Sequence, residues 1–286
     1  MDIISTRAVA EVLGVSEATV KRWSDAGTLR CFRTPGGHRK FRLRDVKSFL
    51  ADQQGQGGPQ NLPAPPVGDL TPEQREARSL ALAGDVDALV SLVASHKLQG
   101  ATLAQTFDEV FFPAMADIGE AWTQGRLSAA QEHMASVAIS DMLARVRPLI
   151  ERSARTDRGR ALCACLGGEH HDIGIRMVSL VLASEGFRTS LLGANVPAGD
   201  LAMMLAGDRP NLVALSASHV ADPDTLRGDL AVVASAAATT RSQIVVGGPG
   251  FQRIAALPSN VRRFGSLREM VTITFGKPFG SAAEAR

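Results

Sequence analysis

The chain has 286 residues, of which 45% are hydrophobic and 21% charged, which is typical of a globular multidomain protein and excludes a disordered one. Its apolar runs are too short to span a bilayer, and its N-terminal segment lacks the pattern of a signal peptide, so we expect a cytoplasmic protein with no membrane partner. Residues 1–50 hold ten Lys or Arg and five Asp or Glu, a net charge of +5, which leaves −3 for the rest. A polyanionic partner is therefore expected at the N-terminus.

Two breaks in the pattern divide the chain into three predicted domains. Residues 53–69 are rich in Gly, Pro and Gln and are predicted to be a flexible linker. Near residues 153–160 the helical periodicity stops and a strand-like run begins. We therefore expect domains at residues 1–52, 70–155 and 156–286.

The first predicted domain has helix-turn-helix spacing. Ser5 and Ser16 can each cap a short helix, and the basic stretch around Pro35, Gly36 and Gly37 predicts a tight hairpin, or wing. In this geometry the second helix enters the major groove of DNA and the wing contacts phosphates. The residues expected to bind DNA are Thr19, Lys21, Arg22, Arg33, His38, Arg39 and Lys40.

The second predicted domain is a helical bundle. Apolar residues recur at three- and four-residue spacing, which predicts about four or five helices, and Thr71 with Pro72 is a typical helix start. Trp122 and the Glu132–His133 pair lie on either side of a polar turn. Taken alone, they would be a core tryptophan and a partly buried histidine, so their role depends on the third domain.

The third predicted domain alternates strands and helices. Strands are expected at residues 160–168, 188–193, 211–218 and 243–250, and helices at residues 172–187, 197–208 and 223–240. This alternation predicts a Rossmann-like parallel sheet with helices on both faces. Because ligands of such sheets bind at the carboxyl ends of the strands, residues 169–174, 193–195, 216–218 and 247–250 are the candidate site.

Two common sites of this fold are disfavoured. The first strand-to-helix turn reads GGEHHDIG, not G-x-G-x-x-G, and no acidic residue clearly ends the second strand, which argues against NAD. His170 and His171 are adjacent and project differently, while Cys163 and Cys165 share one face of a strand, which argues against zinc. The cysteines, including Cys31, are expected to stay reduced.

The motif EHHDIG resembles the E/D-x-H-x-x-G pattern of base-off cobalamin-binding domains, as in methionine synthase and the mutases, together with LSAS and GGPG further along. The resemblance implies that His171 is the lower axial ligand of cobalt, that Glu169 or Asp172 polarises its imidazole, and that His170 faces solvent or lies behind the ligand. The cofactor-binding residues that the resemblance implies are Trp122, Glu132, His133, Glu169, His171, Asp172, Gly174, Ser216, Ser218, Gly247 and Gly248, with Ser216, Gly247 and Gly248 lining the channel for the dimethylbenzimidazole tail.

The order of the domains resembles the CarH/LitR family of light-sensing transcriptional regulators over nearly the whole chain. VAEVLGVSEATVKRW followed by RTPGGHRKF resembles the MerR-type winged helix-turn-helix of that family. The resemblance implies a repressor, not an enzyme, whose bundle covers the upper face of adenosylcobalamin. It also implies a dimer of dimers that binds operator DNA in the dark and leaves it when light breaks the cobalt–carbon bond.

One position departs from the family pattern. Well-known members have a histidine directly after the motif tryptophan, and this chain has Thr123 there. After photolysis the upper position would then go to His133 or to water. A light-independent cobalamin or redox sensor is the alternative function, and a corrinoid methyl-transfer shuttle is a further one.

Overall fold

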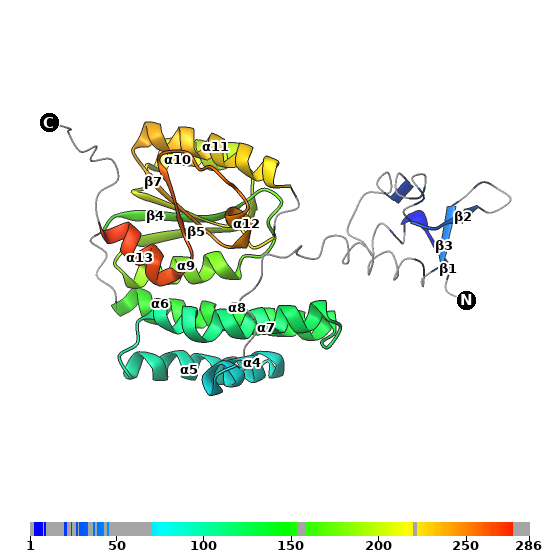
Figure 1. The fold of residues 1–286 in the computed structure, drawn as a ribbon, viewed down its shortest axis with the longest axis horizontal. Coiled ribbons are helices and arrows are strands. Elements are labelled where there is room, and N and C mark those ends of the chain that lie inside the picture. The colour runs from blue at the N-terminus through cyan, green and yellow to red at the C-terminus, as the bar shows by residue number, and fades with distance from the viewer. Residues whose placement is uncertain are drawn as a thin grey trace. The chain divides into compact units, whose positions relative to one another are not determined.

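The computed structural model describes residues 70–153, 158–219 and 222–276, together with scattered residues between 3 and 45. The chain forms two compact units, Met1–Asn61 and Leu62–Arg286, which are described separately below (Figure 1). The predicted linker, residues 53–69, lies outside the described residues, and the predicted domain boundaries stay predictions.

The first unit contains a small antiparallel sheet in the order β1–β3–β2, made of β1 (Ile3–Ser5), β2 (Phe32–Arg33) and β3 (Arg39–Arg42). Strands β2 and β3 form the predicted wing, and Gly37 between them has a φ of 78°, a conformation that glycine adopts without strain. Strand β1 was not predicted. Ser5, expected to cap a helix, ends this strand opposite Lys40.

The second unit begins with the predicted helical bundle. It comprises α4 (Pro72–Ala83), α5 (Val86–Leu98), α6 (Leu103–Thr106), the π-helical turn η1 (Phe107–Phe111), α7 (Phe112–Thr123) and α8 (Ala129–Ser153). Thr71 caps α4 as expected, because its hydroxyl accepts the Gln74 N–H while the Gln74 side chain accepts the Thr71 N–H. The sequence therefore predicts both the class of this region and its first helix start.

The π-helical turn η1 has a local cause. Pro113 lacks an N–H, so the carbonyl of Glu109 loses the partner that an α-helix would give it. The side chain of Gln74 in α4 donates to this carbonyl at 2.7 Å instead. This bond joins the first helix of the bundle to the wide turn that leads into α7.

The rest of the second unit is a five-stranded parallel sheet in the order β5–β4–β6–β7–β8. The strands are β4 (Arg160–Leu166), β5 (Arg188–Val196), β6 (Leu212–Ser216), β7 (Gln243–Gly247) and β8 (Val261–Phe264). Helices α9 (Ile173–Ser184) and α13 (Leu267–Gly276) cover one face, α10 (Ala198–Asp208) and α11 (Pro223–Thr240) cover the other, and α12 (Pro249–Gln252) follows β7 (Figure 1). The Rossmann-like class is confirmed, while β8 and α13 were not predicted.

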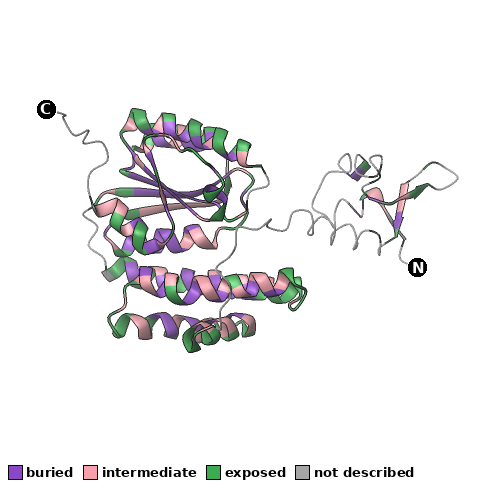
Figure 2. Cartoon of the chain, in the orientation of Figure 1, coloured by how far each residue is buried: buried purple, intermediate pink, exposed green. Residues whose placement is uncertain are grey.

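Alternation along β4 separates two buried layers. Cys163 and Cys165 lie in the core with α9 and the bundle, whereas Leu162 and Ala164 lie in the core with α10 and α11. The first of these cores continues from the sheet through α9 into α8, so α9 is buried on both sides (Figure 2). The bundle and the sheet are therefore packed against each other as one body.

Two polar contacts also join the bundle to the sheet. Arg147 of α8 donates to the hydroxyl of buried Ser179 in α9 at 3.0 Å. Asp108 of η1 accepts the N–H groups of Leu267 and Arg268 at 2.9 and 3.0 Å and so caps the start of α13. A residue of the bundle thus accepts hydrogen bonds from N–H groups at the start of α13 that have no acceptor within that helix.

Candidate functional site

The strand order places the candidate site between two loops. From β4 the chain adds β5 on one side of the sheet and then β6, β7 and β8 on the other, so the order of strand addition reverses between β4 and β6. Ligands of such parallel sheets bind at this switch point, at the carboxyl ends of the strands. The loop after β4 carries Glu169 and His171, and the loop after β6 carries Ser218 and His219. Both candidate loops therefore meet at the switch point of the sheet.

Glu169 holds His171 through one carboxylate oxygen. Its Oε1 lies 2.7 Å from both the backbone nitrogen and the Nδ1 of His171. The side chain of Glu169 is 3% exposed and that of His171 is 65% exposed. The bond to Nδ1 fixes the neutral tautomer with hydrogen on Nδ1 and leaves the lone pair of Nε2 for a ligand.

The second carboxylate oxygen of Glu169 binds the other loop. Its Oε2 accepts the backbone N–H groups of Ser218 and, at 2.7 Å, of His219. The imidazole of His219 then lies beside that of His171, with ring centroids 6.2 Å apart. Sequence analysis missed His219, because only the strand order brings a histidine after β6 next to one after β4.

Glu169 and His171 shift each other's pKa. Burial raises the pKa of Glu169, but hydrogen bonds from the ring and backbone of His171 and the backbone of His219 outweigh it and lower that pKa overall. The hydrogen bond to Glu169 raises the pKa of His171 against the effect of burial, and the charges of Glu169 and Glu132 add to it.

Asp172 does not contact the imidazole of His171. Its carboxylate binds Arg176, one turn further along α9, with an Oδ2–Nη2 distance of 2.7 Å. Of the two acids expected to polarise His171, Glu169 is the one whose carboxylate lies at hydrogen-bond distance from its ring. His170 is exposed.

The predicted glycines lie where the backbone is crowded. A Cβ on Gly174 would lie 3.1 Å from the hydroxyl of Ser216, which is buried, so the first turn of α9 packs closely on the end of β6. A Cβ on Gly247 would lie 2.3 Å from the ring of Phe264, and one on Gly248 would lie 2.4 Å from the carbonyl of Ala217. A side chain at Gly247 would displace the Phe264 ring, and one at Gly248 would displace the backbone of Ala217.

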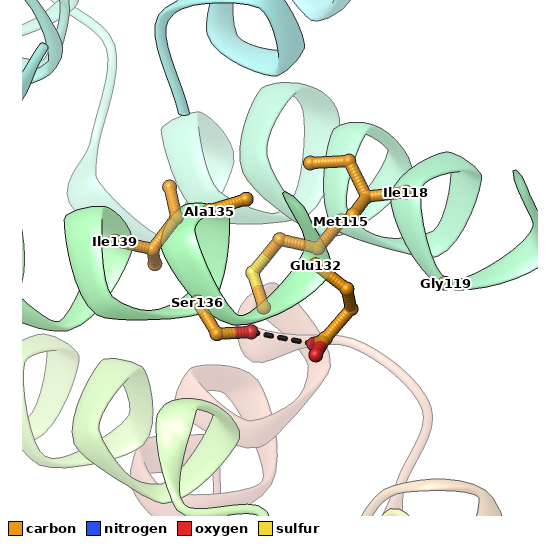
Figure 3. Close-up of a pocket in the computed structure, with 7 residues that line it drawn as sticks. All are labelled: Met115, Ile118, Gly119, Glu132, Ala135, Ser136 and Ile139. Atoms are coloured by element: carbon orange, nitrogen blue, oxygen red, sulfur yellow. Dashed lines mark hydrogen bonds between the residues drawn. The ribbon is translucent and has the colours of Figure 1, made fainter. Parts of the chain in front are cut away.

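The bundle presents a small pocket between α7 and α8 (Figure 3). It is lined by Met115, Ile118, Gly119, Glu132, Ala135, Ser136 and Ile139. The Glu132 carboxylate accepts the Ser136 hydroxyl at 2.7 Å and lies 2.6 Å from Nδ1 of His133, which is 76% exposed. The pocket thus combines apolar side chains with the hydrogen-bonded pair Glu132 and Ser136, and Glu132 also contacts the exposed imidazole of His133.

Trp122 and Thr123 end α7. Trp122 is half-buried, and Thr123 is exposed. The Thr123 hydroxyl donates to the carbonyl of Gly119 at 2.9 Å, which ties it to its own helix. The predicted motif thus joins the last turn of α7 to the first turn of α8, where Glu132 lies.

Part of the predicted DNA-binding surface is described. Arg33 is exposed on β2, and Arg39 and Lys40 are half-buried on β3. Lys21 is exposed. The other predicted contacts, Thr19, Arg22 and His38, lie outside the described residues.

Three domain families match the chain in succession. Residues 3–54 match a helix-turn-helix domain, residues 74–147 match one B12 binding domain and residues 159–258 match another. The two B12 binding matches fall on the bundle and on the sheet, the two parts that carry the candidate site. No helix in the described part of the chain has the length and apolar character needed to cross a membrane.

Two curated repressors of Myxococcus xanthus are similar over most of the chain. The HTH-type transcriptional repressor CarH is 29% identical over 235 residues, covering 72% of this chain and 76% of that protein. The HTH-type transcriptional repressor CarA is 28% identical over 261 residues, covering 85% of this chain and 86% of that protein.

A solved structure has the same fold in the second unit. The monomethylamine corrinoid protein of Methanosarcina barkeri superposes with a TM-score of 0.55 at 16% identity, covering 70% of this chain and 96% of that one. The order of the matched domains, the curated relatives and the Glu169–His171 contact are all consistent with a cobalamin-binding regulator. The three matched domains and the two curated repressors therefore support a cobalamin-binding regulator of the CarH type.

Proposed function

We propose that this protein is an adenosylcobalamin-dependent photoreceptor and transcriptional repressor that binds operator DNA in the dark and leaves it in light. The observation that carries the proposal is the exposed imidazole of His171, held by buried Glu169. Two similar proteins are named transcriptional repressors, which supports the DNA-binding output.

His171 fits the role of lower axial ligand. A histidine that ligates a metal must be neutral, and its second ring nitrogen needs an acceptor that fixes the tautomer. Glu169 is such an acceptor at Nδ1, and its burial keeps water from competing for the bond. Nε2 of His171 would then hold cobalt.

The loops around Ser216 fit the detached nucleotide tail of the cofactor. A Cβ on Gly174 would lie 3.1 Å from the Ser216 hydroxyl, and Gly247 and Gly248 have no room for a side chain. Close-packed glycine backbone allows a bound group to approach the main chain. We propose that Ser216, Ser218 and these glycines line the channel for the dimethylbenzimidazole.

The end of the bundle fits the upper face of the cofactor. Trp122 offers a flat apolar surface, while Glu132 and His133 offer polar atoms that could bind the ribose hydroxyls of an adenosyl group. Bound adenosylcobalamin supplies a cobalt–carbon bond that visible light breaks. Because adenosyl contacts exist only before illumination, they would bias the protein toward its dark state.

The DNA-binding output would come from the first unit. Arg33, Arg39 and Lys40 supply positive charge on the wing, and Lys21 lies in the helix-turn-helix segment. We propose that the dark protein is a dimer of dimers, because repeated half-sites raise affinity without new contacts on each module.

Size-exclusion chromatography and DNA band shifts of the full chain test the proposal. The protein is loaded with adenosylcobalamin, kept dark or given green light, and tested on DNA enriched by rounds of binding to the dark protein. We expect a larger assembly and a shifted band only in the dark. Equal assembly and equal DNA binding before and after illumination would contradict it.

One observation favours a second candidate, a cobalamin sensor that works without light. The hydroxyl of Thr123 is hydrogen-bonded to the carbonyl of Gly119, and a threonine is a poor cobalt ligand, so this position supplies no histidine ligand. The affinity of such a sensor for DNA would change when cobalamin binds, but it would be the same in the dark and in light.

In the light-dependent protein, the exposed His133 near the start of α8 is the candidate for the upper position after photolysis.

A further inference from the structure

The turn after β6 places a second imidazole beside His171. The ring centroids of His171 and His219 are 6.2 Å apart and their planes meet at 74°, an edge-to-face arrangement. The backbone of His219 donates to Oε2 of Glu169 at 2.7 Å, while His171 uses Oε1. One buried carboxylate therefore holds both the ring of His171 and the backbone of His219.

The ring of His171 is largely exposed, so a neighbouring side chain can restrict its rotation. Its side chain is 65% exposed, and rotation of the ring about the Cβ–Cγ bond would carry Nδ1 away from Glu169 and break the hydrogen bond that orients it. Aromatic rings in edge-to-face contact attract each other and resist such rotation. His219 is half-buried, and its anchored backbone prevents it from moving away.

We propose that His219 is a positioning residue for cobalamin binding: its ring packs against the imidazole of His171 and keeps Nε2 in the direction that Glu169 sets. This inference rests on the proposed role of His171 as a cobalt ligand. The shape of the ring carries the effect, since the hydrogen bond to Glu169 comes from the backbone of His219 and survives any side-chain change.

The affinity of the full chain for hydroxocobalamin tests the role of the ring. We expect His219→Ala to weaken binding about 2- to 10-fold, the range that an aromatic pair contributes. His219→Phe keeps a flat ring without nitrogens and should restore binding to within about twofold of wild type. His170→Ala is the matched control, because His170 is an exposed neighbour of His171 and should leave binding unchanged.

Nitrogen-15 NMR of the cofactor-free chain gives a second readout. We expect the Nδ1–H proton of His171 to exchange with water faster in His219→Ala than in wild type, and at the wild-type rate in His219→Phe. Ala and Phe variants that behave alike in both measurements would overturn the inference. A wild type that fails to bind hydroxocobalamin would overturn the proposed function instead, and the NMR comparison would still decide the role of His219.

Discussion

The Oε1 atom of Glu169 lies 2.7 Å from the Nδ1 of His171, and the carboxylate is buried while the imidazole is exposed. This relationship is that of a metal ligand and the acceptor behind it, in which the acceptor orients the ring and raises its basicity. It gives the adjacent histidines of the sequence different roles. His171 is held in one orientation, and His170 projects into solvent.

Replacing the acceptor should weaken cobalamin binding. Glu169→Gln removes the charge and one acceptor oxygen, so the ring of His171 loses its fixed tautomer, and we expect affinity to fall about 10- to 100-fold. His171→Ala should also change the absorption spectrum of the bound cofactor, because the nitrogen ligand is gone. Titrations followed by absorbance measure both effects. A Glu169→Gln variant that binds like wild type would show that the pair does not serve the cofactor.

The position after the motif tryptophan should control the product of illumination. Thr123→His puts an imidazole where this chain has a hydroxyl bonded to Gly119, and we expect it to accelerate or stabilise a spectrum of two-histidine ligation after green light. Wild type and variant are compared after the same light dose. His133→Ala in the wild-type background is the control: if an immediate two-histidine spectrum survives it, His133 is not the upper ligand.

The wing should contribute electrostatic affinity for DNA. Lys40 lies on β3 of the wing, and Lys40→Ala should reduce the slope of log K against log salt by about one, as expected for one lost phosphate contact. Filter binding or band shifts across a salt series measure the slope. Lys97→Ala, at the end of α5, serves as the control and should leave the slope unchanged. An unchanged slope in both variants would place Lys40 outside the DNA interface.

The contact between η1 and α13 should stabilise the second unit. Asp108→Ala removes the acceptor for the N–H groups of Leu267 and Arg268, and loss of a helix cap costs about 0.5–2 kcal/mol of unfolding free energy. Glu109→Ala removes only an exposed ion pair to Arg268 and should cost less than about 1 kcal/mol. Urea denaturation compares the two. Equal losses would mean that the cap contributes no more than a surface ion pair.

The buried cysteines should resist alkylation in the folded protein. Burial raises the pKa of Cys163 and Cys165 to about 12, so almost no thiolate, the form that attacks iodoacetamide and displaces its iodide, is present at neutral pH. Cys31 is only half-buried. Mass spectrometry after labelling should find Cys31 modified first, with the other two reacting only in denaturant. Rapid labelling of Cys165 would show that the loop above β4 opens.

Periodic elements could be predicted from the sequence because their signals are local. The helices of the bundle and the strands β4, β6 and β7 follow from apolar spacing alone. Strand β8 contains Arg262 and Arg263, which hide its pattern, and β1 is only three residues long and exists through pairing with β3. Short strands of this kind depend on partners that the local sequence does not specify.

Contacts between distant loops could not be predicted. The bond from Ser218 to Glu169 joins residues 49 positions apart, and that from Leu267 to Asp108 joins residues 159 positions apart. Both run from backbone N–H groups to a carboxylate, so the sequence at the donor end carries no signal. Glu169 was identified from its motif, while the place of His219 beside it required the strand order.

Helix α8 is fastened to the sheet near one end and carries Glu132 near the other. Arg147 and Glu132 are 15 positions apart, about 22 Å along a helix axis. A tilt of about 5° around the Arg147 end would move the Glu132 end by about 2 Å, with the anchoring contacts almost unchanged. The helix would thus act as a lever: if Glu132 faces the cofactor as proposed, repacking there would shift the start of α8 while Arg147 stays bonded to Ser179 of α9.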